Sequence, residues 1–145
     1  MTKTPCVLVC VTQQSGSERL IKAGKAIAQR NGLDINVINV QPANASYAPN
    51  PEMMEKLHQC CKQAEAQLTV YFNDSPELVA ASYARKCNAV DIVTGFPGAN
   101  SSEFVASIHM LLPDVTISMV DENLTIYNMT PQQKEMGVLI NNINI

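Results

Sequence analysis

The chain of 145 residues contains no tryptophan, and its aromatic and charged shares are low, at 5% and 16%. Its ten Lys and Arg residues are scattered, and the 13 acidic residues bring the net charge to −3. The sequence therefore offers no basic field that would attract a nucleic-acid backbone. We expect no nucleic acid among its partners.

A long apolar run is also missing. The first apolar run, Cys6–Val11, has only six residues, which is too short to cross a bilayer. The residues around it do not have the layout of a signal peptide. We expect no membrane association.

The cysteines do not form a disulfide framework, because their number is odd and their spacing matches no small disulfide scaffold. All of them fall inside predicted strands or helices, where buried, reduced thiols are expected. This usage is typical of the reducing cytoplasm. His58, Cys60 and Cys61 would project in different directions from a helix, so we expect no metal site there. The five cysteines are Cys6, Cys10, Cys60, Cys61 and Cys87.

Apolar runs alternate with segments of helical periodicity along the whole chain, which predicts an α/β fold with parallel strands. Ser17 is a candidate cap for the first helix, which Gly32 ends, and Pro51 suits a first helical turn. The predicted strands cover residues 6–11, 35–40, 68–72, 90–94 and 115–120, with a short extra strand at 124–127. We expect residues 1–121 to form the α/β domain and 122–145 a C-terminal extension that contributes to a homodimer.

Two turns stand out as a possible binding site, because each leads from a strand into a helix. In an open parallel sheet, ligands bind at the carboxyl edge, where helix N-termini offer free amides to anions. Glycines in these turns let a phosphate approach the backbone, and hydroxyl groups add donors. The predicted nucleotide-binding residues are Thr12, Ser15 and Ser17 in the first turn, Gly95, Gly98, Ser101 and Ser102 in the second, and Val40 beside an adenine.

Each of these signals also has a plainer interpretation. Two glycines are common in any turn from a strand to a helix, and Ser15 and Ser17 can serve only to cap a helix. The segment 15–18 lacks the second glycine and the aspartate of the S-G-G-x-D-S pyrophosphatase loop. No nucleophile, base and orienting group can be assembled from the sequence, so we expect no enzymatic activity.

The segment Gly95-Phe96-Pro97-Gly98 matches the first half of the G-x2-G-x9-G-[S/T] phosphate motif of the universal stress proteins, and the chain resembles that family over about residues 5–120. The resemblance implies a doubly wound, five-stranded sheet of order 3-2-1-4-5, often with ATP across strands one and four, and dimers formed through strand five. The second half of the motif is absent, because Ser101-Ser102 follows directly after Ala99-Asn100. Thr12-Gln13-Gln14 replaces the Asp that ATP-binding members tend to carry.

The stretch of residues 7–20 is more similar to the stress-protein domain of KdpD sensor kinases, some of which bind cyclic di-AMP through an S-x-S element. Ser15-Gly16-Ser17 matches that element, and Ala43 and Tyr47 match part of a second one. We therefore expect a regulatory protein of the stress response that binds ATP, AMP or cyclic di-AMP without catalysis. The alternative is a dimeric interaction module of the same fold that binds no nucleotide.

Overall fold

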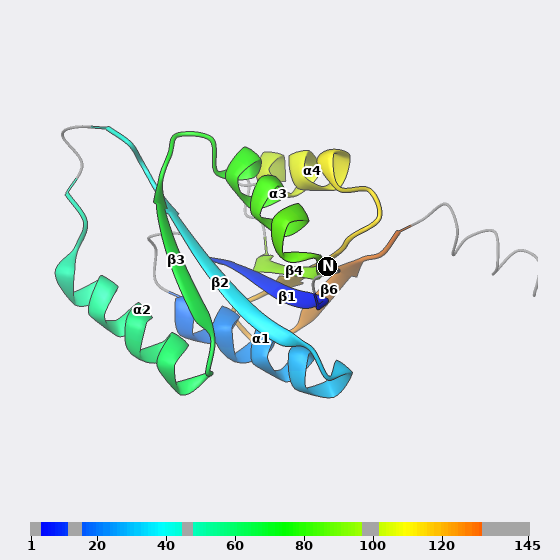
Figure 1. The fold of residues 1–145 in the computed structure, drawn as a ribbon, viewed down its shortest axis with the longest axis horizontal. Helices are drawn as coiled ribbons and strands as arrows, with labels where there is room; N and C mark the ends of the chain where they lie inside the picture. Colours follow the sequence, from blue (N-terminus) through cyan, green and yellow to red (C-terminus); the bar gives the residue numbers. More distant parts are fainter. Residues whose placement is uncertain (1–3, 12–15, 45–47, 97–101, 132–145) are drawn as a thin grey trace, which may run out of the picture.

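The computed structural model describes residues 4–11, 16–44, 48–96 and 102–131, without the side chain of Ser102. Helices and strands alternate along the chain until a final pair of neighbouring strands (Figure 1). In chain order, the elements are β1 (Cys6–Val11), α1 (Ser17–Asn31), β2 (Asp34–Gln41), α2 (Pro51–Gln63), β3 (Gln67–Phe72), α3 (Pro76–Cys87), β4 (Ala89–Gly95), α4 (Ser102–Leu111), β5 (Thr116–Val120) and β6 (Ile126–Met129).

The strands form one sheet of order β3-β2-β1-β4-β5-β6. The first five strands are parallel, which confirms the predicted α/β fold and the order 3-2-1-4-5. The sixth strand pairs antiparallel with β5, from Val120 opposite Ile126 to Ile117 opposite Met129. An extra strand was expected, but at residues 124–127, and the structure places it two residues later.

This shift has a local cause in the turn between β5 and β6. The Asp121 carboxylate accepts hydrogen bonds from the backbone N–H groups of Asn123 and Thr125, both at 2.9 Å. Leu124 adopts a left-handed conformation with φ 65° inside this turn. Residues 124 and 125 are therefore needed to reverse the chain, and the strand begins only at Ile126.

Helices cover both faces of the sheet, with α1 and α2 on one side and α3 and α4 on the other (Figure 1). All six residues of β1 are buried, because β1 lies in the middle of the sheet between these two layers. Val7 and Val9 pack into the layer of α1 and α2. Leu8 and Cys10 alternate to the opposite layer of α3 and α4.

The helix ends agree with the sequence at two positions and correct it at a third. Gly32 ends α1 in a left-handed conformation, and Pro51 opens α2 behind Asn50, whose side chain accepts two backbone N–H bonds. The prediction that Ser17 caps α1 is wrong. Gly16 occupies the cap position, since its carbonyl already accepts the N–H of Leu20, and Ser17 is the first helical residue.

None of the five cysteines forms a disulfide bond. Cys6, Cys10 and Cys61 are buried, whereas Cys60 and Cys87 are partly exposed. Among the described helices, none combines the length and the apolar character that a membrane crossing requires.

Candidate functional site at the carboxyl edge of the sheet

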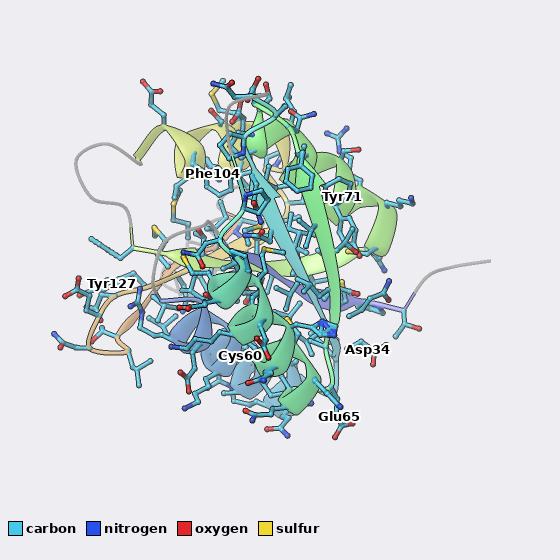
Figure 2. All side chains as sticks on the ribbon, turned by 90° about the vertical axis from the view of Figure 1, so that its left-hand side faces the viewer. Asp34, Cys60, Glu65, Tyr71, Phe104 and Tyr127 are labelled. Carbon is cyan, nitrogen blue, oxygen red and sulfur yellow. The ribbon has the colours of Figure 1, made fainter. Side chains whose placement is uncertain are left out.

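The carboxyl ends of the parallel strands open into a hollow of about 1160 Å³. In Figure 2, Asp34 at the start of β2 and Glu65 just before β3 mark the amino edge at the lower right, and Tyr71 near the carboxyl end of β3 lies above them. The hollow is larger than the 300–1,000 Å³ that is usual for small-molecule sites. Its walls come from the ends of β1, β2, β4 and β5, the starts of α1, α3 and α4, and the turns after β3 and β5.

The floor of the hollow is apolar. Cys10, Ile38 and Ala80 belong to the core layer of α3 and α4, and none of them is more than 7% exposed. Burial raises the pKa of the Cys10 thiol to about 12, so this sulfur stays protonated at neutral pH. Such a floor suits the flat apolar faces of an aromatic ring and provides no ready nucleophile at Cys10.

A buried polar chain links the ends of β1 and β2. The side-chain amide of Gln41, a residue that lines the hollow, donates a hydrogen bond of 2.6 Å to Asn39 Oδ1 and faces Met54 of α2. Asn39 Nδ2 in turn donates to the carbonyl oxygen of Val11 at 3.0 Å. Both side chains are only 2% exposed, so these bonds fix the edge firmly.

Arg19 is the one basic side chain among the described residues that line the hollow. Its guanidinium turns back over Gly16 at the start of α1, where a Cβ on Gly16 would lie 3.2 Å from Arg19 Nη1. A side chain at position 16 would also be strained by its φ of 118°. Gly16 therefore leaves room for the guanidinium at the helix N-terminus.

The position of Arg19 is electrostatically unfavourable without an anion. A helix N-terminus carries a partial positive charge and so disfavours a neighbouring cation. Arg19 Nε is in addition buried without a hydrogen-bond partner. An unpaired buried donor costs about 1–3 kcal/mol, and more when it is charged. An anionic ligand at this place would offset the repulsion between Arg19 and the helix N-terminus, and it would supply the hydrogen-bond acceptor that Nε lacks.

The rim of the hollow is otherwise acidic. Two of its five carboxylates are already engaged: Asp74 accepts the backbone N–H of Ala43 at 3.0 Å, and Asp121 holds the turn before β6. The other three have no hydrogen bond or ion pair to any described residue. They are Glu77, Glu103 and Glu122.

One side of the hollow ends in an aromatic contact. Phe96 follows β4, and its ring lies 4.6 Å from the ring of Tyr127 on β6, measured between centroids. The backbone N–H of Phe96 also donates to the carbonyl of Val120 at 2.9 Å. These contacts hold Phe96 against the outer strands.

The structure brings together the strand ends from which the two selected turns leave, because β1 and β4 are neighbours and their carboxyl ends share the hollow. Of the predicted binding residues, Ser17, Val40 and Gly95 line it. A Cβ on Gly95 would meet nothing within 4 Å, so this position is open. Thr12, Ser15, Gly98 and Ser101 and the side chain of Ser102 lie outside the described residues. Ligand contact by any of the eight stays a prediction.

Sequence reasoning did not select Arg19, Gln41 or Thr94, although all three line the hollow. A signal for Arg19 was available, since a residue three positions after a glycine cap can reach back over the first turn of a helix. Gln41 and Thr94 end strands at the expected edge, and their polarity within apolar runs could have indicated the site.

Searches for related sequences find no matching family model and no matching curated protein. Solved structures do match. The universal stress protein from Archaeoglobus fulgidus in complex with dAMP is 14% identical with a TM-score of 0.55, covering 75% of this chain and 92% of that chain. A universal stress protein in complex with cAMP is also 14% identical, with a TM-score of 0.56 and coverages of 75% and 90%. The fold is that of the universal stress proteins.

The same architecture also matches an enzyme. GalB, the 4-carboxy-2-hydroxymuconate hydratase from Pseudomonas putida, is 9% identical with a TM-score of 0.51, and the match covers 74% of this chain but 54% of that one. At such identities the comparisons establish the fold alone, because one fold supports different functions.

Proposed function

We propose that this protein is a universal stress protein that binds an adenine nucleotide carrying one phosphate in the hollow at the carboxyl edge. The observation that carries the proposal is Arg19, a cation at a helix N-terminus whose buried Nε has no partner. A phosphate beside it would accept charge-assisted hydrogen bonds from the guanidinium and from the free amides of α1.

The acidic rim argues for few phosphates. Among the residues that the structure describes, five carboxylates and one guanidinium line the hollow, so each additional phosphate charge meets more repulsion than attraction. The truncated phosphate motif after β4 points in the same direction, because it offers fewer backbone amides than a triphosphate needs. The dAMP and cAMP in the two matched universal stress proteins each carry a single phosphate.

The base of the nucleotide has a suitable surface on the floor. Ile38, Ala80 and Val105 provide apolar contact, and Gln41 at the end of β2 also lines the hollow. An apolar floor with a few fixed polar groups is the usual composition of a small-molecule site. We propose that the adenine lies there, near Val40.

We further propose that binding regulates a cytoplasmic stress response and that no reaction follows it. Cysteines that form no disulfide fit a reducing compartment. Burial keeps the Cys10 thiol protonated, and Asp74 and Asp121 are engaged in hydrogen bonds with the backbone, which makes these three groups unsuited to acid–base chemistry. Over the described ranges, no three His, Cys, Asp or Glu side chains are grouped to hold a metal ion. The likeness of residues 7–20 to KdpD adds cyclic di-AMP to the ligands to be tested.

The test is calorimetric titration with adenosine, AMP, ATP and cyclic di-AMP. We expect AMP to bind more tightly than ATP, and Arg19→Gln to weaken AMP binding about 10- to 100-fold, the range for a hydrogen bond to a charged group. Adenosine binding should be unchanged in that variant. Lys22→Gln is the matched control, since Lys22 lies on the same helix in an exposed pair with Glu18. Equal affinity of wild type and Arg19→Gln for AMP would contradict the proposal.

A second function has its own support. Four exposed apolar side chains, Phe96, Leu124, Ile126 and Tyr127, gather where β6 forms the sheet edge. Such an edge suits a homodimer or another partner, so the chain would then be an interaction module of the same fold. This function predicts no heat of binding with any of the four ligands but a defined dimer in solution.

A further inference from the structure

Two cysteines that are far apart in the sequence meet at the amino edge of the sheet, opposite the hollow. Cys6 is the first residue of β1, and Cys87 is the last residue of α3. Their Sγ atoms lie 3.2 Å apart although 81 positions separate them. Asp34, labelled in Figure 2, marks this edge because it pairs in register with Cys6.

The backbone holds the two thiols in this position. The N–H of Cys6 donates to the carbonyl of Asn88 at 3.2 Å, and Cys6 pairs in register with Ala89. Asn88 takes a left-handed conformation with φ 58°, which turns the chain sharply from α3 into β4. The turn into β4 therefore holds Cys87 next to the start of β1. The sulfur atoms need to approach by only about 1 Å to reach the bond length of a disulfide.

The surroundings favour reaction at this pair over the buried thiols of Cys10 and Cys61. The hydrogen bond with Cys87 lowers the pKa of Cys6 to about 7, aided by Asn36 and opposed by burial and by the Asp34 carboxylate. Burial instead raises the pKa of Cys10 to about 12 and that of Cys61 to about 11. Because the thiolate is the nucleophile, reactivity at neutral pH concentrates at Cys6 and its partner.

We propose that Cys6 and Cys87 are an oxidative modification site, a thiol pair that hydroperoxides convert into an intramolecular disulfide. The thiolate of Cys6, the thiol whose pKa is lowered, attacks one peroxide oxygen. The O–O bond breaks, and the hydroxide or alkoxide that leaves takes up the proton that Cys6 released and becomes water or an alcohol. The sulfur of Cys87, the more exposed of the two, then loses its proton and attacks the sulfenic acid on Cys6, the S–O bond breaks, and the hydroxide leaves as water with that proton.

The disulfide would constrain a long stretch of chain, since it closes a loop between positions 81 residues apart. A cross-link of this span restricts the unfolded chain strongly. We expect the melting temperature to rise by about 10 °C on oxidation and to return on reduction.

The experiment treats the full chain with hydrogen peroxide at neutral pH and follows it by intact mass and peptide mapping. We expect a product that has lost two hydrogen atoms and carries a Cys6–Cys87 link. Cys60→Ser is the matched control, because Cys60 is also partly exposed, and it should give the same product at the same rate. Cys6→Ser and Cys87→Ser should each abolish the product.

Three results would overturn the proposal. One is a map that shows a link between other cysteines or between chains. Another is a wild-type protein that gains oxygen atoms without losing two hydrogens. The third is a melting temperature that is the same before and after complete oxidation. The last measurement uses unmodified wild type, so it holds even if a cysteine variant fails to fold.

Discussion

Cys10 illustrates how a single buried residue contributes to the pH dependence of protein stability. Its thiol lies 7% exposed at the floor of the hollow, and burial raises its pKa from 9.0 to about 12. The unfolded chain loses this proton near pH 9, whereas the folded chain keeps it. The contribution of this proton to the free energy of unfolding is therefore complete below pH 9 and is lost as the pH rises toward 12.

This difference gives a prediction at the residue scale. Under reducing conditions, the free energy of unfolding of wild type should fall by about 1 kcal/mol more than that of Cys10→Ala between about pH 8 and pH 10. Denaturant unfolding at both pH values measures it. Cys6 has a lowered pKa and so acts in the opposite direction, but it is present in both proteins and cancels. Parallel pH profiles for the two proteins would contradict the assignment.

At the scale of elements, the close contact between α1 and β1 depends on Gly24. A Cβ at this position would overlap Cγ2 of Val9, which is fully buried in β1. Glycine lowers helix stability by about 1 kcal/mol relative to alanine, so its presence in mid-helix indicates a packing requirement. The contact places the start of α1, and with it Arg19, against the end of β1.

We predict that Gly24→Ala destabilises the protein by about 1–3 kcal/mol, because overpacking outweighs the gain in helix propensity. Chemical denaturation measures the change. Adding Val9→Ala to this variant should recover part of the loss relative to the sum of the single substitutions. The exposed Ala26 supplies the control, where glycine should cost about 1 kcal/mol by propensity alone. A Gly24→Ala variant more stable than wild type would refute the packing argument.

The elements also show how far the sequence could be interpreted. Period and length predicted the parallel strands and their flanking helices, because buried strands are continuous apolar runs. The predicted start of β6 was wrong because the side chain of Asp121 decides where the preceding turn ends. The apolar residue Leu124 lies inside this turn rather than in the strand. Arg19 was missed for a related reason: its role comes from a side chain that folds back over Gly16.

For the whole molecule, the outer edge of β6 is the feature with the largest consequence. β6 covers β5 within the same chain, so a partner that approaches this side meets β6 first. Ser118 Oγ lies 2.8 Å from Asp91 Oδ1 and 2.9 Å from Asn128 Oδ1, which ties β6 to β5 and β4. The strand carries no charged residue that would discourage pairing with another copy.

We predict a homodimer whose contact includes β6. Light scattering should give twice the chain mass for wild type and the mass of one chain for Ile126→Lys, which places a charge on this edge. Leu78→Lys is the control, since Leu78 is 56% exposed on α3, and it should remain a dimer. A monomeric wild type, or a dimeric Ile126→Lys variant, would contradict a dimer contact through β6.

The central claim is that an anion belongs beside Arg19 at the start of α1, and a crystal structure of the protein with AMP tests it most directly. The account predicts the phosphate within hydrogen-bond distance of the Arg19 guanidinium, with the adenine on the apolar floor near Ile38 and Ala80. A structure with AMP bound elsewhere, or with Arg19 turned away from a bound phosphate, would contradict it.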